Sequence, residues 1–130
     1  MEEVYEFLKN CDVFYLATVD GDKPRVRPFG ALNIFEGKLY LQTSRSKPVA
    51  KQMGANPNVE ICAFKGDRWL RLEGKVVDDP RREAKADMLE KNPELKAMYS
   101  PDDEKTEVLY FENAKATFYS FGGAPRVIGF

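Results

Sequence analysis

The sequence predicts one mainly β (α+β) domain over residues 1–130, in which antiparallel strands close into a barrel flanked by helices. The chain has 130 residues, the usual size of a single domain. About six or seven runs of β-branched and aromatic residues are separated by turn residues, and one helical excursion interrupts them. An open sheet of so few strands would expose an apolar face, so we expect helices or a partner subunit to cover it.

The N-terminal part is expected to form a helix and then a three-stranded antiparallel meander. The first residues place apolar side chains at i, i+3, i+4 and i+7, the spacing of one helical face. Asp20-Gly21 and Glu36-Gly37 are the turn signals between the strands. The expected elements are a helix over residues 1–11 and strands over residues 13–19, 25–35 and 38–43.

The remaining elements begin with a helix near Pro48. Ser44 or Ser46 can cap this helix, and Pro48 suits its first turn. Asp79 and Pro80 mark the start of a second helix in the same way. The expected elements are helices over residues 48–53 and 80–91, a short helix that carries residues 95–99, and strands over residues 58–64, 68–78, 107–112, 114–121 and 126–130.

The chain contains no histidine, and this excludes several kinds of chemistry. Catalytic systems of the Ser-His-Asp or Cys-His type and histidine-ligated haem cannot form, and zinc lacks its usual ligands. We therefore expect no metal site and expect any enzymatic reaction to depend on a cofactor. Cys11 and Cys62 lie among apolar residues and are expected to be buried, reduced thiols.

Cellular location and partners are constrained by hydropathy and charge. No apolar run approaches the roughly 20 residues of a membrane helix, and the acidic N-terminus does not resemble a secretory signal. We therefore expect a cytoplasmic protein without membrane contact. The net charge of −1 argues against binding to nucleic acid.

Basic residues are concentrated in one part of the chain. Between Lys23 and Lys51 there are seven basic residues and one acidic residue. The rest of the chain, by subtraction from 20 basic and 21 acidic residues, holds 13 basic and 20 acidic residues. This local excess predicts a site for a small anion, and the alternative is a solvated basic surface.

The first half of the candidate site is the segment Lys23–Gly30. Arg25 and Arg27 alternate in a predicted strand and should project from the same face. Pro28 cannot donate to a strand ladder, which indicates a strand edge or bulge. Gly30 allows a flat ligand to approach the backbone closely. Together these features predict a cradle for a planar anion.

The second half is the segment Gln42–Lys47, where a predicted strand runs into the start of a helix. The free amides of a helix N-terminus favour phosphate. Thr43, Ser44 and Ser46 add hydroxyl groups, and Lys47 adds a positive charge. The alternative is ordinary capping by a serine, with Lys47 in solvent.

Several segments, taken in order, resemble the pyridoxamine 5′-phosphate oxidase-like family of FMN-binding split barrels. The resemblance covers nearly the whole chain and depends on the order and spacing of these segments. They are Tyr15-Leu16-Ala17-Thr18-Val19, Pro24-Arg25-Val26-Arg27-Pro28, Leu39-Tyr40-Leu41-Gln42-Thr43-Ser44 with Lys47, Asn56-Pro57, and Leu72-Glu73-Gly74-Lys75-Val76.

The resemblance implies a six-stranded antiparallel split β-barrel that forms a homodimer, with two FMN molecules at the subunit interface. It implies that Arg27 and Lys47 hold the FMN phosphate, aided by Thr43 and Ser46. The backbone of residues 28–30 would run beside the isoalloxazine ring. The residues implied in cofactor binding are Arg27, Pro28, Phe29, Gly30, Gln42, Thr43, Ser44, Ser46, Lys47 and Trp69.

Two features depart from the family pattern. Authentic pyridoxamine phosphate oxidases have an arginine-rich C-terminal segment, whereas residues 122–130 contain one arginine. We therefore do not expect oxidation of vitamin B6 phosphates. Trp69 occupies the position of a glutamine that contacts flavin from the other subunit. It would either stack on the flavin or fill the dimer core.

The predicted function is that of an FMN-dependent oxidoreductase. A reduced nicotinamide would be the electron donor, and a small planar molecule such as a quinone, a nitroaromatic compound or free flavin would be the acceptor. No residue offers itself as an acid or base. Two alternatives remain open: a flavin carrier or stress-related binding module with little turnover, and a reductase that binds a deazaflavin in place of FMN.

Overall fold

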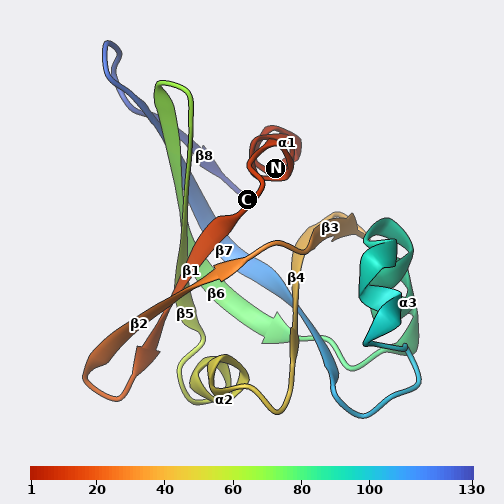
Figure 1. Cartoon of the computed structure of the whole chain (residues 1–130). Helices are drawn as coiled ribbons and strands as arrows, with labels where there is room; N and C mark the ends of the chain where they lie inside the picture. Colours follow the sequence, from red (N-terminus) through yellow and green to blue (C-terminus); the bar gives the residue numbers. More distant parts are fainter.

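The computed structural model describes all 130 residues, and it shows one twisted antiparallel sheet of eight strands with three α-helices (Figure 1). None of the helices is long and apolar enough to cross a membrane. In chain order the elements are α1 (Glu2–Asn10), β1 (Phe14–Asp20), β2 (Lys23–Phe29), β3 (Leu32–Phe35), β4 (Lys38–Ser44), α2 (Pro48–Ala55), β5 (Asn58–Lys65), β6 (Arg68–Asp78), α3 (Arg82–Lys91), the 3-10 helix η1 (Pro93–Ala97), β7 (Thr106–Ser120) and β8 (Arg126–Gly129).

The mainly β architecture predicted from the sequence is confirmed, with a strand order of β2-β1-β5-β6-β7-β4-β3. Strand β8 adds to β7 outside this path. The two extra strands relative to the expected six, β3 and β8, have four residues each. The six longer strands form the wall that encloses the core. The β3–β4 hairpin and α3 stand apart from the layer that contains β1 and β5, and α2 lies below them (Figure 1).

The predicted meander is wrong, because the expected strand over residues 25–35 is two strands with different partners. Strand β2 pairs with β1, and Arg27 lies opposite Leu16. Strand β3 pairs with β4, and Leu32 lies opposite Leu41. The chain leaves one side of the barrel and enters the other at residues 30–31, directly after Pro28, which cannot donate to a ladder.

The two strands predicted over residues 107–112 and 114–121 are one strand, β7. Asn113 has a positive φ of 54°, and the β6–β7 register shifts between Glu73 and Lys75. A Cβ at Gly74 would lie 3.2 Å from the Cα of Ala114, so the bulge requires close contact of the two backbones. Strand β7 is bent at this bulge. Its first residues pair with β4, and its residues after the bulge pair with β8.

Helix starts differ from the predicted capping. Helix α2 begins at Pro48 as expected, but its N-cap is Lys47, not a serine. Helix α3 begins at Arg82, because the Asp79 carboxylate accepts the Arg81 backbone N–H at 3.1 Å before the helix starts. This contact turns the chain into α3 without using Pro80 in the first helical turn.

The main core lies inside the barrel and beneath α1, which contributes Val4, Phe7 and Leu8. A smaller cluster around Tyr40 and Met88 holds α3 against β4. Both chain termini lie near α1 (Figure 1). Cys11 is buried as predicted, whereas the prediction for Cys62 is wrong, because Cys62 is exposed on β5.

Candidate functional site

A cavity of about 400 Å³ lies where the chain crosses from β2 to β3. We call it the β4 cavity. Six of the ten residues predicted from the sequence line it: Pro28, Phe29, Gly30, Gln42, Thr43 and Lys47. The other lining residues are Asp12, Ala31, Glu94, Leu95, Met98 and Tyr99. Its volume falls within the range of about 300–1,000 Å³ that is usual for small-molecule sites.

Two consecutive, buried polar residues of β4 line this cavity. Gln42 is 6% exposed, and its Nε2 donates to the Thr43 carbonyl at 3.1 Å. Thr43 is 3% exposed, and its hydroxyl has no hydrogen-bond partner. Thr43 lies directly opposite Glu107 in the β4–β7 pairing, so its enclosed hydroxyl belongs to the sheet face of Glu107 and is not accessible from the cavity.

Lys47 lines the cavity from the N-terminus of α2. It takes part in none of the ion pairs of the structure. Pro48, the first helical residue, has no N–H, and the Ala50 N–H is used by the Lys47 carbonyl at 3.1 Å. The start of this helix therefore offers few free amides, and the ammonium group of Lys47 is its main positive charge toward the cavity.

Arg27 directly precedes Pro28 but does not itself line the cavity, and its side chain reaches toward α2. Its Nη1 donates to the Leu16 carbonyl at 3.1 Å and to the Thr18 hydroxyl at 2.8 Å. Its Nη2 donates to Gln52 of α2 at 2.7 Å. These bonds use three of the five N–H donors of a guanidinium group, so two remain.

No carboxylate neutralises Arg27, although its side chain is partly buried. Burial, and to a smaller extent the neighbouring Arg25, lower the pKa of Arg27. Arg25 itself pairs with Asp20 at 3.0 Å. The two arginines share a strand face as predicted, but only Arg27 keeps a charge without a partner.

The two serines predicted to bind the cofactor do not line the cavity. The hydroxyl groups of Ser44 and Ser46 lie 3.0 Å apart and bond to each other at the bend between β4 and α2. Ser44 is buried, and its Oγ also accepts the backbone N–H of Ser46 at 3.5 Å. The pair therefore shapes the turn that presents Lys47.

The wall contributed by η1 was not identified as part of the site from the sequence. Leu95, Met98 and Tyr99 line the cavity opposite Phe29. The buried Asn92 amide holds this segment in place by donating to the Leu32 carbonyl at 3.0 Å. The sequence did predict a short helix that carries residues 95–99. Its position beside the β2–β3 crossing could not be predicted, because that position depends on the long-range contact of Asn92 with Leu32.

Arg45, another cation of the basic stretch, points away from the cavity. It pairs with Asp78 and Glu107, both at 2.8 Å. Burial raises the pKa of Glu107, and the nearby Asp78 adds to this effect. The predicted basic excess therefore does not converge on one site, because Arg25 and Arg45 are paired with carboxylates, Lys47 lines the β4 cavity, and Lys23, Lys38 and Lys51 lie outside it.

A second polar cluster, which we call the Asp79 cluster, comprises Glu36, Tyr40, Asp79 and Arg81. The Tyr40 hydroxyl donates to Asp79 at 2.6 Å, and Arg81 donates to Asp79 at 2.9 Å and to Glu36 at 3.0 Å. Arg81 lowers the pKa of the buried Asp79 carboxyl to about 2. Burial and the bond to Asp79 raise the pKa of Tyr40.

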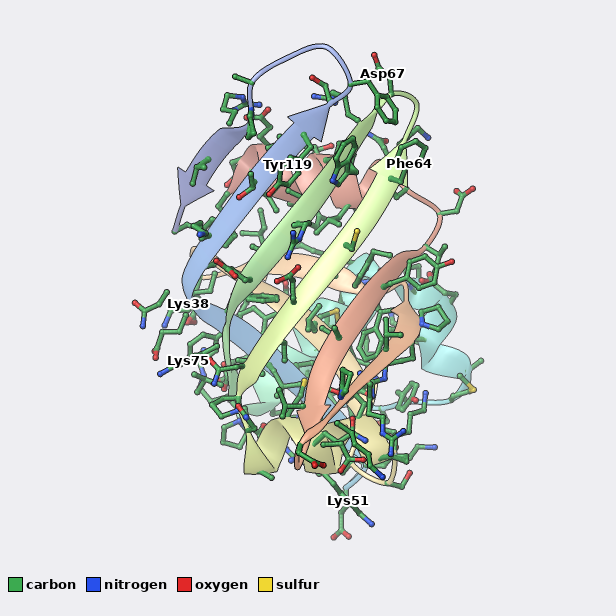
Figure 2. All side chains as sticks on the ribbon, turned by 90° about the vertical axis from the view of Figure 1, so that its left-hand side faces the viewer. Lys38, Lys51, Phe64, Asp67, Lys75 and Tyr119 are labelled. Atoms are coloured by element: carbon green, nitrogen blue, oxygen red, sulfur yellow. The ribbon has the colours of Figure 1, made fainter.

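Trp69 lies apart from the β4 cavity of its own subunit. It is half-buried on β6 and stacks on Tyr119, with ring centroids 5.1 Å apart and planes at 9°. Phe64 and Trp69 are directly opposite in the β5–β6 pairing, so all three rings belong to one face of the sheet. Figure 2 shows this outer face, which no helix crosses.

The outer face carries more apolar surface toward β2. Tyr15 is 48% exposed and Val26 is 67% exposed. The largest hollow, about 710 Å³, lies at the far end of this face around Lys23 and Lys75. None of the ten residues predicted to bind the cofactor lines it, whereas six of them line the β4 cavity. We therefore assign the functional site to the β4 cavity.

The β4 cavity fits a phosphorylated planar ligand. Two cations without carboxylate partners, Arg27 and Lys47, can hold a phosphate. No protein atom lies within 4 Å of the place that a Cβ of Gly30 would occupy, so packing leaves that part of the backbone accessible. Phe29 and Leu95 provide apolar surface for a ring.

Comparisons with known proteins identify the family and the fold of the chain. The model of the protein family described as pyridoxamine 5′-phosphate oxidase matches residues 1–119. A crystal structure of a NimC/NimA family protein from Clostridium acetobutylicum is 49% identical, with a TM-score of 0.97, over 100% of this chain and 92% of that chain. The crystal structure of general stress protein 26 from Bacillus anthracis is 20% identical, with a TM-score of 0.76, over 99% of this chain and 97% of that chain. The comparison with curated proteins found no match.

Proposed function

The chain belongs to the pyridoxamine 5′-phosphate oxidase family, and from this premise we propose that it binds FMN in the β4 cavity and acts as an oxidoreductase. Flavin binding is common in this family and supports the choice of cofactor. The observation that carries the proposal is the pair of cations, Arg27 and Lys47, that have no carboxylate partner beside this cavity.

The phosphate of FMN is a dianion and requires positive charge at its site. Lys47 supplies an ammonium group at the start of α2, and Arg27 supplies its two remaining N–H donors. Gln52 connects these groups, because it accepts from Arg27 and lies on the helix that Lys47 caps.

The remaining walls suit the flavin ring. Phe29 and the η1 side chains give apolar contact, and the backbone of residues 28–30 and the Gln42 amide give polar contact. Bound FMN would supply the redox chemistry, accepting a hydride from a reduced nicotinamide and passing two electrons, with protons, to a small planar acceptor. The protein's part is to position the two partners and limit access of water.

Oxidation of vitamin B6 phosphates is not part of this proposal. Arg126, the arginine of the C-terminal segment, forms an ion pair with Glu3 of α1. It does not line the β4 cavity. A second phosphate, carried by the substrate, would therefore find no arginine from this segment.

We also propose that two copies of the chain associate through the outer face. Tyr15 and Pro28 are directly opposite in the β1–β2 pairing, and Pro28 also lines the β4 cavity. A second copy packed on this face would therefore adjoin the cavity. Trp69 and its stacked neighbours would then lie in the interface, where a partner's ring could contact the cofactor.

The association can be tested by light scattering of the protein in solution. The wild-type chain is expected at twice the monomer mass. Val26→Lys, which places a charge on exposed apolar surface at the β2 edge of this face, should yield the monomer. Ala97→Lys, on exposed η1, should remain a dimer. A wild-type monomer, or a dimeric Val26→Lys variant, would contradict the proposed interface.

The cofactor proposal is tested by titrating the purified protein with FMN and following flavin absorption and fluorescence. We expect saturable binding and reduction of the bound flavin by a reduced nicotinamide. Protein that leaves the FMN spectrum unchanged would overturn the proposal. Binding without reduction by a nicotinamide would retain the flavin site and reject the oxidoreductase assignment.

A further inference from the structure

We propose that the β4 cavity selects a planar electron acceptor that carries positive charge and rejects anionic ones, through Asp12 and Glu94. This inference rests on the proposed FMN site, because the acceptor must meet the flavin in the same cavity. Both carboxylates line the cavity, and neither is identified with any role by the family resemblance.

Neither carboxylate is neutralised within the protein. Asp12 and Glu94 take part in none of the ion pairs of the structure. The one cationic side chain that lines the cavity is Lys47. Once Lys47 is committed to the phosphate of FMN, the charge that remains on the cavity walls is negative.

The acids and the cations lie at different ends of the β1–β2 pair. Asp12 lies two residues before β1, whose first residue, Phe14, pairs with Phe29. Arg27 donates to the Leu16 carbonyl and the Thr18 hydroxyl, farther along β1 and next to α2. The phosphate end is therefore distinct from the end that Asp12 reaches.

Glu94 reaches the same end from another element. The Asn92 side chain donates to the Leu32 carbonyl, which fixes the start of η1 beside the β2–β3 crossing. Glu94 follows two residues later. Two unpaired carboxylates from separate segments thus converge near residues 29–32.

The side chains between the two ends suit an aromatic ring. With Phe29 and Leu95 in contact with the flavin ring, Met98 and Tyr99 remain as apolar surface for the acceptor, and Met98 is 62% exposed. A flat ring with a cationic group would match apolar walls and acidic rim together, whereas an anionic group would meet like charges.

The test uses three ligands with one ring and different charges: 4-nitrophenyltrimethylammonium, 4-nitrobenzyl alcohol and 4-nitrobenzenesulfonate. Each is titrated by calorimetry into the FMN-loaded protein, and into the FMN-free protein, with no reductant. We expect the cation to bind about tenfold more tightly than the anion at low salt, since each exposed charge contributes modestly. The neutral ligand should fall between them.

The variant that removes the selection is Asp12→Asn combined with Glu94→Gln. Both side chains are exposed and unpaired, so the unfolding midpoint should not change. The ratio of cation to anion affinity should fall to near one. The matched control, Asp67→Asn with Glu104→Gln, removes the same charge at exposed positions outside the cavity and should keep the wild-type ratio.

The outcomes separate this inference from the proposed function. Equal or tighter binding of the anion, no binding of any ligand, or loss of selection in the control variant overturns the inference. A protein that does not bind FMN but still prefers the cation overturns the proposed function and leaves the charge selection standing. Cation preference that disappears only in the cavity variant, in FMN-loaded protein, supports both.

Discussion

The Asp79 cluster and the phosphate end of the β4 cavity use the same kinds of residue in opposite ways. In the Asp79 cluster, Arg81 donates to Asp79 and to Glu36. At the cavity, Arg27 donates only to neutral protein oxygens, and Lys47 has no ion-pair partner.

The difference separates structural charge from charge available for binding. A partly buried charge usually carries its counter-ion within the protein, because desolvation penalises it otherwise. The Asp79 cluster follows that rule and fixes the start of α3. The partly buried Arg27 does not follow it, which is the behaviour expected where the counter-ion is a ligand, whereas Lys47 is exposed and the rule does not apply to it.

The largest expected effect is on stability and comes from Asp79→Ala. The substitution leaves the buried Tyr40 hydroxyl without its acceptor and removes the partner of Arg81. We expect a loss of about 3 kcal/mol in the free energy of unfolding, measured with denaturant, and no change in FMN affinity. Glu36→Gln, at an exposed member of the cluster, should cost less than about 1 kcal/mol.

The same cluster predicts the acid sensitivity of the protein. The pKa of Asp79 falls from its ordinary value of 3.8 to about 2 in the folded chain. A lowered folded pKa stabilises the protein above pH 4, and this contribution, about 2 kcal/mol, is lost as the pH falls from 4 to 2. Unfolding free energies across this range should decline less steeply for Asp79→Asn. If the unfolding free energies of the wild type and of Asp79→Asn fall equally between pH 4 and pH 2, Asp79 is not the source of the acid sensitivity.

The phosphate end predicts a smaller effect that appears in binding alone. Lys47→Ala should weaken FMN binding about tenfold, because one charged contact to the phosphate is lost. Its unfolding free energy should match that of the wild type. Lys51→Ala removes the same charge one turn along α2, outside the cavity, and should leave FMN affinity unchanged. If Lys47→Ala and Lys51→Ala lose FMN affinity equally, the lysines act by general electrostatic attraction of FMN and Lys47 does not contact the phosphate.

The parts of the site that were predicted from the sequence depend on local signals. The run from Gln42 to Pro48 encodes a strand, a bend and a helix start within seven residues, and the structure places Gln42, Thr43 and Lys47 on one cavity. The mainly β fold follows equally from local alternation and turns. Neighbouring residues fix such features, so they can be read from one sequence.

The parts that could not be predicted depend on distant partners. Nothing local distinguishes Arg45 from Arg27, because the neutralising residues Asp78 and Glu107 are 33 and 62 residues away from Arg45. The split of residues 25–35 between two sides of the barrel depends on which strands pair with β2 and β3. The η1 wall depends on the bond from Asn92 to Leu32.

The most direct test compares FMN with riboflavin, which lacks the phosphate, in the wild type and in two variants of β2. The wild type should bind FMN about a hundredfold more tightly than riboflavin, because the phosphate meets Arg27 and Lys47. Arg27→Gln should lose at least tenfold of that preference, whereas Arg25→Gln, whose charge is paired with Asp20, should keep it. Equal binding of the two flavins by the wild type, or equal losses in both variants, would contradict the claim that the unpaired cations hold a phosphate.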